Sequence, residues 1–297
     1  AYGGKFDELD VRSLCLIRET LGRTSGLADF VFAMQGLGSG TITLFGSDAI
    51  KQEYLTGVRN GTKTAAFALT ELASGSDVAN MDSTAEDRGD HYVVNGAKTY
   101  ISNGGIADYY VLFVRTGEAP GAKGISAFVV EKGTPGLSFG AQEQKMGWNA
   151  QPTAQVIFDG VRVSADALLG GTEGAGFGIA MNGLNGGRIN IAACSLGGAQ
   201  AAYDKALDYV AGRQAFGGAL LDEPTIRFTL ADMATGLEAS RNMLWRAASA
   251  LDSNHPDKVA LCAMAKRYVT DTCFEVADQA LQLHGGYGYL REYGLEK

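Results

Sequence analysis

The segment Phe67–Asp77 carries the residue types best suited to holding a polar ligand. It reads Phe-Ala-Leu-Thr-Glu-Leu-Ala-Ser-Gly-Ser-Asp, an apolar run that passes into hydroxyls, small side chains and one glycine. Such a loop offers backbone N–H groups and hydroxyls, and glycine lets a planar or phosphorylated ligand approach the main chain closely. Taken alone, the segment also fits an ordinary Ser/Gly turn, so a binding role depends on other segments.

Histidine and cysteine offer little for metal or nucleophilic chemistry. His91, His255 and His284 are well separated, and neither H-E-x-x-H nor a Cys/His cluster occurs. The cysteines show no C-x-x-C spacing and all fall in segments with a helical pattern, so we expect reduced thiols that pack as small hydrophobes. These are Cys15, Cys194, Cys262 and Cys273. No metal site is predicted.

Two other patterns suggest chemistry that their surroundings do not support. Gly170–Gly178 contains G-x-G, but it follows the end of a strand and a loop, and no parallel βαβ unit surrounds it. Ala193–Gly197 partly resembles a nucleophile elbow, yet the first glycine is absent and the segment lies in a helical pattern. We therefore expect Ser195 to pack, and Gly170–Gly178 to form turns and a linker.

The composition is that of a globular protein with an unusually high share of glycine. Apolar residues make up 46% and charged residues 20%, while 41 of 297 residues are glycine against only 5 prolines. The net charge is -8 with no basic block, which disfavours nucleic-acid binding. No apolar run approaches the roughly 18 residues of a membrane span, and Ala1–Gly4 opens without a leader pattern. The chain is expected to be soluble and unexported, or a fragment.

Hydrophobic periodicity divides the chain into three zones. Residues 6–61 have a helical pattern, with a glycine-rich break at Gly36–Gly40 and a second helix around 49–55. Residues 63–163 carry short β-branched and aromatic runs bounded by turns. From Gly178 onward the pattern predicts three long helices. The expected strands are 65–70, 91–94, 99–102, 109–114, 125–130 and 155–158.

Local signals refine these zones. Asn95-Gly96 between two apolar runs predicts a two-residue hairpin turn, because a type I′ turn needs positive φ at both positions. Pro224 and Pro256 fall where new helices should begin. After Pro224, apolar residues at 3.6 spacing predict one buried face of a helix bundle. These residues are Leu230, Met233, Ala234, Leu237 and Leu244.

The order helix, strand, helix predicts an α+β fold rather than alternating βαβ units. We expect an antiparallel β-barrel or sandwich between two helical regions, with domains at residues 1–62, 63–172 and 173–297. A Rossmann sheet is disfavoured by the same order.

Further segments join the first in the order and spacing of one family. The matching segments are Thr70–Asp77 against T-E-P-G-x-G-S-D, Asn95–Ser102 against N-G-x-K-x-[WFY]-I-[ST], Arg213–Gly217 against R-x-x-F-G and Gln282–Gly288 against Q-x-x-G-G-x-G. Across almost the whole chain the sequence resembles the FAD-dependent acyl-CoA dehydrogenases. With Leu184–Asn190 and Phe228–Met233 it is most similar, within that family, to isobutyryl-CoA and short-branched-chain members.

The resemblance implies where FAD and an acyl-CoA substrate would bind. The flavin would be lined by residues 67–76 and by the strand that follows Lys98, namely Phe67, Leu69, Thr70, Gly75, Ser76, Tyr100, Ile101 and Ser102. Ser76 would also reach the CoA, which would face Asn185, Gly186, Gly187 and Arg188. The pyrophosphate and adenine of a neighbouring subunit's FAD would contact Arg213, Phe216, Gln282, His284, Gly285 and Gly286, so a homo-oligomer, a tetramer, is implied. For Arg213 a solvated helix-end cation, and for Gly285-Gly286 a plain helix cap, remain the alternatives.

The reaction so implied removes two hydrogens across Cα–Cβ of a thioester and passes electrons to an electron-transfer flavoprotein. A carboxylate takes the α-proton while the β-hydrogen leaves as hydride to the flavin. The compartment would be the cytoplasm of a bacterium or the mitochondrial matrix of a eukaryote. A silent flavin-binding or acyl-CoA-binding homologue and an oxidase relative remain as alternatives.

The sequence departs from the family pattern at several points. The usual base is a Glu in an E-G-[ST] segment that we expect beyond Lys297, and the position that carries it in some relatives is Gly187 here. Glu173-Gly174 is expected to form a turn, and Glu292 to be structural. Leu72-Ala73 replace Pro-Gly, and Pro224 stands where Gln is common. Tyr2–Gly4 resembles a point well inside the first domain, so the chain is expected to be an internal fragment, with partial N-terminal helices and an incomplete C-terminal bundle.

Overall fold

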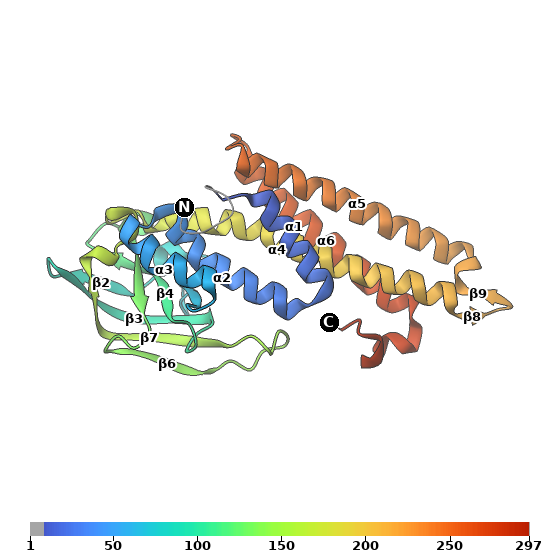
Figure 1. The fold of residues 1–297 in the computed structure, drawn as a ribbon, viewed down its shortest axis with the longest axis horizontal. Coiled ribbons are helices and arrows are strands. Elements are labelled where there is room, and N and C mark those ends of the chain that lie inside the picture. The colour runs from blue at the N-terminus through green and yellow to red at the C-terminus, as the bar shows by residue number, and fades with distance from the viewer. Residues whose placement is uncertain (1–8, 297) are drawn as a thin grey trace. The chain divides into compact units, whose positions relative to one another are not determined.

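The computed structural model describes residues 9–296, which divide into two compact units. The β unit is residues 30–184, and the helical unit joins residues 9–29 to residues 185–296 (Figure 1). The expectations for Tyr2–Gly4 and for a helix start at Phe6 lie outside the described residues. No helix within residues 9–296 is both long enough and apolar enough to cross a membrane.

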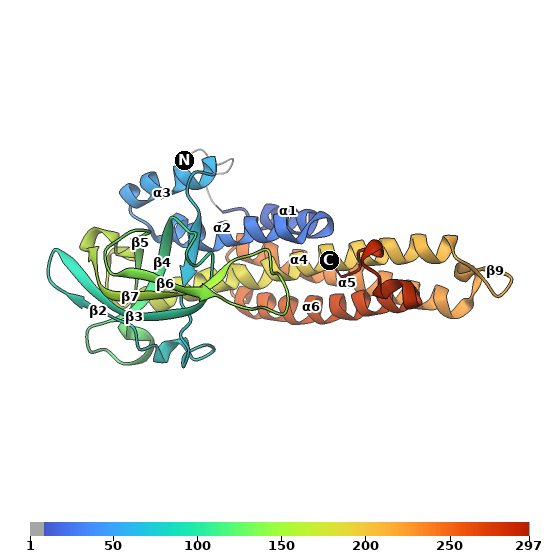
Figure 2. The ribbon, with the colours of Figure 1, turned by 90° about the horizontal axis from the view of Figure 1, so that it is seen from below.

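A seven-stranded sheet that curls on itself forms the β unit (Figure 2). Its order is β1-β4-β2-β3-β7-β6, and β5 pairs with β4. The strands are β1 Ala65–Ala68, β2 Thr84–Asp87, β3 His91–Ser102, β4 Tyr109–Thr116, β5 Ile125–Glu131, β6 Leu137–Gln142 and β7 Thr153–Ser164. β4 runs parallel to β1 and to β2, and every other pairing is antiparallel, so the sheet is mixed rather than wholly antiparallel. Parallel neighbours are possible because long connections separate these strands in the chain.

Strand β4 is apolar on both faces because each face borders its own core. Successive side chains of a strand point to opposite faces. One set, Tyr109, Val111 and Phe113, joins a buried cluster with Ile42 of α2 (Gly26–Phe45) and Ile50 of α3 (Asp48–Asn60). The other set packs inside the curl of the sheet. It consists of Tyr110, Leu112 and Val114, which meet Phe128, Val156 and Phe158.

The glycine-rich break predicted at Gly36–Gly40 is wrong, because these residues lie inside α2. A Cβ built on Gly38 would stand 2.6 Å from the Cβ of Ala65, whereas Gly36 and Gly40 have open space. Gly38 therefore lets α2 approach β1 closely. Glycine at this position serves close packing and does not break the helix.

The hairpin predicted at Asn95-Gly96 is also wrong. Both residues lie within the continuous strand β3, where the register with β7 shifts between Val94 and Gly96. Gly96 does adopt a positive φ of 137°, and a Cβ there would meet Ser83 at 2.3 Å. The positive φ that the pair signals is thus used for a bulge instead of a turn.

Two strands of this sheet were not predicted from the pattern. β2 is largely exposed, and β6 contains Gly140 and has no buried residue. Neither carries the alternating β-branched run that identifies a strand in sequence. They form because the backbone of β3 and of β7 offers them a hydrogen-bonding edge.

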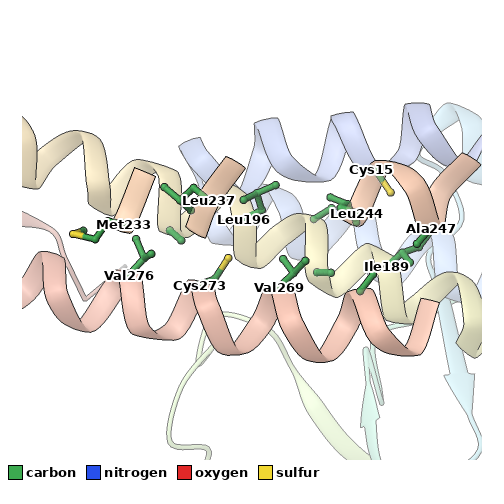
Figure 3. Close-up of a cluster of buried hydrophobic side chains, with 14 of the residues drawn as sticks. Cys15, Ile189, Leu196, Met233, Leu237, Leu244, Ala247, Val269, Cys273 and Val276 are labelled. Atoms are coloured by element: carbon green, nitrogen blue, oxygen red, sulfur yellow. The ribbon is translucent and has the colours of Figure 1, made fainter. Parts of the chain in front are cut away.

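The helical unit contains α1 (Val11–Thr24), the C-terminal part of α4 (Gly176–Gly212), α5 (Pro224–Asp252) and α6 (Lys258–Leu283). This confirms the three long helices, and Pro224 begins α5 as predicted. On α5, Leu230, Met233, Leu237 and Leu244 are buried, as the stripe predicted, while Ala234 is half-buried. Figure 3 shows α5 residues meeting Ile189 and Leu196 of α4 and Val269, Cys273 and Val276 of α6. The α+β fold class is confirmed.

The cysteines are free and lie in helices, which confirms the expectation for them. Burial raises the pKa of the Cys15 and Cys273 thiols to about 12, so they pack as small hydrophobes. Ser195 lies inside α4 and donates to the Ile191 carbonyl at 2.9 Å, as expected of a packing residue.

Candidate functional site

The loop after β1, residues 69–77, is folded against the sheet and open along its far half. We call it the flavin loop, after the ligand that the sequence resemblance implies for it. Leu69 is buried and Thr70 half-buried, and Glu71 and Ser74 exchange backbone hydrogen bonds of 3.2 Å. Ser74 Oγ donates to the Asp77 carbonyl at 2.6 Å. The following Gly75, Ser76 and Asp77 are exposed, so the Ser76 hydroxyl and the backbone groups of Gly75 and Ser76 remain available.

Strand β3 carries a second irregularity beside this loop. Lys98 pairs with Val156 and Ile101 with Ala154, so three steps along β3 match two along β7. This is a β-bulge, and we call Lys98–Ile101 the β3 bulge. Tyr100 within it has a φ of 57° and a side chain 60% exposed. A non-glycine residue in this region is strained and persists only where its surroundings hold it.

The structure brings the two sequence-predicted flavin segments together within the β unit. Thr99 N–H donates to the Thr70 carbonyl at 2.8 Å. The exposed Gly75 and Ser76 and the exposed Tyr100 therefore belong to two segments joined by main-chain hydrogen bonding.

Three of the predicted flavin residues have little side chain to offer. Leu69 and Ile101 are 6% and 2% exposed and belong to the two apolar cores of the β unit. Phe67 is half-buried, with its ring 4.7 Å from that of Phe113. For Leu69 and Ile101, only the main chain can contact a ligand.

Lys98 and Glu71 lie within the matching motifs, but the resemblance names neither of them as a ligand contact. Lys98 Nζ lies 2.7 Å from Glu71 Oε1, with 0% and 7% of the two side chains exposed. The sequence signal that could have identified them is a charged residue of each sign within mostly apolar segments, because a buried charge must be paired. Burial lowers the pKa of Lys98 to about 8, against the raising effect of Glu71.

The segment expected to face the acyl-CoA lies on α4 in the helical unit. Asn185, Gly186, Gly187 and Arg188 are all half-buried. Arg188 Nη1 donates to Asn185 Oδ1 at 2.7 Å, and a Cβ on either glycine would meet nothing within 4 Å. This stretch of α4 therefore offers a guanidinium next to a smooth glycine surface.

The segments expected to reach a neighbouring subunit's FAD lie at other places in the helical unit. Strands β8 (Gln214–Ala215) and β9 (Gly218–Ala219) form a short hairpin whose tip holds Phe216, 90% exposed at a φ of 52°. The Arg213 guanidinium lies 5.5 Å from the centre of the Tyr287 ring, within reach of a cation–π contact. Because Phe216 is 90% exposed, its ring packs against little of the described chain.

Residues 282–286 span the end of α6 at Leu283 and the start of the 3-10 turn Gly285–Tyr289. Gln282 is exposed, and Gly285 and Gly286 would accept a Cβ without contact, although Gly285 has a φ of 59°. His284 is 3% exposed, stacks on Tyr209 at 4.4 Å and has Nδ1 2.8 Å from the Ala280 carbonyl. The imidazole is thus used inside the unit, and a ligand could contact His284 only through its main chain.

The two glutamates considered in the sequence have ordinary surroundings. Glu173 Oε1 accepts from the Tyr92 hydroxyl at 2.7 Å, and Gly174 has a φ of 78° in a turn, as expected. Glu292 is exposed on the 3-10 turn Arg291–Tyr293. No group of histidine, cysteine, aspartate and glutamate among residues 9–296 is arranged to hold a metal ion.

Comparison with known proteins identifies the family. Three family models match: the acyl-CoA dehydrogenase N-terminal domain over residues 1–62, the middle domain over 66–161 and the C-terminal domain over 174–297. The chain is 45% identical over 282 residues to the mitochondrial isobutyryl-CoA dehydrogenase of Dictyostelium discoideum, covering 95% of this chain and 68% of that protein. It is 50% identical over 256 residues to the Bos taurus enzyme of the same name, covering 86% and 61%.

A solved structure agrees with these matches. Butyryl-CoA dehydrogenase from Megasphaera elsdenii superposes with a TM-score of 0.94 at 39% sequence identity, covering 99% of this chain and 77% of that one. Both the sequence and the fold therefore lead to the same assignment: the chain belongs to the acyl-CoA dehydrogenase family.

Proposed function

We propose that this protein dehydrogenates a short or branched-chain acyl-CoA thioester to the 2-enoyl-CoA with FAD as its cofactor. The observation that carries the proposal is the joining of the flavin loop to the β3 bulge by the Thr99 to Thr70 hydrogen bond, in a chain of this family. The identity of 45% and 50% to two isobutyryl-CoA dehydrogenases favours a short branched substrate.

The residues present fit a flavin. A Cβ on Gly75 would meet nothing within 4 Å, so the loop has an open, smooth surface where a planar ring can approach. Exposed Ser76 supplies a hydroxyl, half-buried Ser102 supplies another, and the exposed Tyr100 ring supplies a stacking surface. When bound, FAD supplies the acceptor for the hydride that leaves Cβ of the thioester.

The chain's own residues would bind and orient the reactants. Ser76 would serve both flavin and CoA, and Asn185–Arg188 would face the acyl-CoA, with Arg188 held by its bond to Asn185. Backbone N–H groups of the flavin loop would stabilise the negative charge that develops on the thioester oxygen of the substrate. The α-proton requires a carboxylate base, and we assign no described residue to that role.

Assembly and partners are part of the same proposal. Exposed Phe216, Arg213 and the open Gly285-Gly286 turn would contact FAD of a neighbouring subunit, which requires a homo-oligomer, a tetramer by the resemblance. Electrons would pass to an electron-transfer flavoprotein. The protein would work in the mitochondrial matrix of a eukaryote or in the cytoplasm of a bacterium.

The visible spectrum of the purified protein and a substrate panel test the proposal. We expect a flavin spectrum whose main band bleaches without oxygen on addition of isobutyryl-, 2-methylbutyryl- or butyryl-CoA more readily than with longer thioesters. A colourless protein that takes up no FAD would overturn it. A bound flavin that no thioester reduces would identify a silent homologue, and rapid reoxidation in air with product bound would identify an oxidase.

A further inference from the structure

The ion pair between Lys98 and Glu71 connects more of the chain than a core contact needs to. Lys98 Nζ contacts Glu71 Oε1 at 2.7 Å, the Leu69 carbonyl at 3.2 Å and Met81 Sδ at 3.6 Å. Glu71 also accepts from the N–H groups of Asp82 at 2.6 Å and Ser83 at 3.0 Å. The pair therefore ties together β3, the flavin loop and the segment that precedes β2.

Stability alone is a weak reason for this arrangement. Both charges leave water almost completely, with 0% and 7% of the side chains exposed. Replacing a buried ion pair by apolar side chains of similar volume is often neutral or stabilising, because desolvation of the two charges offsets their attraction. Hydrogen bonds are directional, whereas apolar contacts are not. Through its hydrogen bonds to the Leu69 carbonyl and to Glu71, Lys98 fixes the positions of both residues relative to β3.

The pair lies next to the strained residue of the β3 bulge. Lys98 and Ile101 are buried on either side of Tyr100, whose ring is exposed at a φ of 57°. Thr99, between Lys98 and Tyr100, donates to Thr70. A bulge conformation of this kind persists only when its neighbours over-determine it, and the Lys98 side chain is one of those fixed neighbours.

The same chain holds a second ion pair of equal burial with no such connection. Arg18 and Asp29 in the helical unit are 4% and 0% exposed, and Arg18 Nη2 lies 2.7 Å from Asp29 Oδ2. This pair joins α1 to the start of α2 and contacts none of the residues assigned to FAD. It shows what a buried pair does in this protein without a neighbouring ligand surface.

We propose that Lys98 and Glu71 are positioning residues for the flavin. Their buried ion pair locks the flavin loop to the β3 bulge, so that the loop surface at Gly75 and Ser76 and the Tyr100–Ser102 surface keep a fixed separation. This inference rests on the proposed function, because it assumes that FAD binds at these two surfaces. Cofactor sites need supporting residues that hold their contact residues to a fraction of an ångström.

The test compares two variants of this pair with one of the control pair. Lys98→Met removes the cation, and the double variant Lys98→Met/Glu71→Gln removes both charges while leaving an amide oxygen for the Asp82 and Ser83 N–H groups. The double variant carries the test if Lys98→Met does not fold, because it leaves no unpaired buried carboxylate. Arg18→Met/Asp29→Asn is the matched control.

The measurements are the rate at which FAD dissociates from the purified protein and the absorption spectrum and midpoint potential of the bound flavin. We expect dissociation to rise about tenfold or more and the flavin band to shift in the Lys98 variants. The control variant removes a pair of equal burial, and whatever its thermal stability it should keep the wild-type dissociation rate within about twofold and an unchanged spectrum. Folded Lys98 variants with the wild-type rate and spectrum, or a control that weakens FAD as much, would overturn the inference.

Hydrogen exchange on the unmodified protein tests the inference independently of the variants. The Thr99 amide and the Ser83 amide both close onto the flavin loop, at Thr70 and Glu71. If the loop and the bulge are locked, FAD binding should raise the hydrogen-exchange protection of both amides by the same factor. Protection of one alone would contradict the lock. Wild-type protein that binds no FAD would instead refute the proposed function.

Discussion

The Thr99 amide donates to the Thr70 carbonyl at 2.8 Å and thereby joins two segments that lie far apart in the sequence. On one side of this hydrogen bond is the open loop surface at Gly75 and Ser76. On the other is Tyr100, held exposed in a left-handed backbone conformation.

Adding volume at Gly75 should weaken FAD binding without unfolding the protein. Gly75 has an ordinary φ, and a Cβ there meets nothing in the protein, so a valine would project into the ligand space. For Gly75→Val we expect FAD affinity to fall about tenfold, a loss typical of a few misplaced methyl groups, with little change in thermal stability. Gly178, at the start of α4, also has open space, and Gly178→Val should leave FAD affinity unchanged. Flavin fluorescence titration and thermal unfolding decide, and equal affinities in the two variants would contradict the site.

The contribution of Lys98 to stability should increase with pH in the alkaline range. Burial lowers the pKa of Lys98 to about 8 from its ordinary 10.5. Between these values the unfolded chain holds more protons than the folded one, so the free energy of unfolding rises with pH and the gain is lost as pH falls through about 8. Urea unfolding from pH 7.5 to 10 should show this slope in wild type and lack it in Lys98→Met/Glu71→Gln. Identical slopes would show that Lys98 titrates normally.

The same ion pair should also make the stability of the protein depend on pH in the acid range, through Glu71. Burial alone would raise the pKa of Glu71, but hydrogen bonds from Lys98, Ser83 and Asp82 together lower it below its ordinary 4.5. The stability that this carboxylate contributes is therefore present above pH 4.5 and is lost as the pH falls through the lowered value. In acid titrations the wild type should lose more stability below pH 4.5 than the double variant does. A parallel loss in both proteins would contradict the prediction.

Two glycines of α2 should respond in opposite directions to the same substitution. Gly38→Ala would place a Cβ 2.6 Å from Ala65 and should destabilise the protein by about 1–3 kcal/mol through overpacking. Gly36→Ala meets open space within the same helix and should stabilise by up to about 1 kcal/mol, because alanine is the better helix former. Chemical denaturation of both variants measures the difference. Equal effects would mean that α2 does not approach β1 as described.

The apolar stripe on α5 should dominate the stability of the helical unit. Leu244 is fully buried against α4 and α6, and Leu244→Ala should cost about 2–5 kcal/mol through lost burial and the cavity left behind (Figure 3). Phe228 on the same helix is 70% exposed, and Phe228→Ala should change stability by no more than about 0.5 kcal/mol. Circular dichroism during denaturation compares the two. A small loss for Leu244→Ala would contradict the core.

The sequence by itself determined what depends on local pattern. The long helices of the second half and the buried stripe of α5 follow from periodicity and prolines, and the motifs carried the resemblance to the family. Positive φ at Gly96 was signalled by its own residue type. Whether that φ served a turn or a bulge was not, because the choice depends on β7 and Ser83, which are distant in the chain.

Only the tertiary structure decided which of several similar residues are closely packed, buried or paired. Gly36, Gly38 and Gly40 look alike in sequence, and only the position of Ala65 distinguishes the one that packs. Lys98 and Glu71 could each have faced water, and their pairing exists because the sheet and the loop bury both charges at one point. The free energy of a buried charge depends on its partner and its solvent exposure, and both are properties of the folded chain.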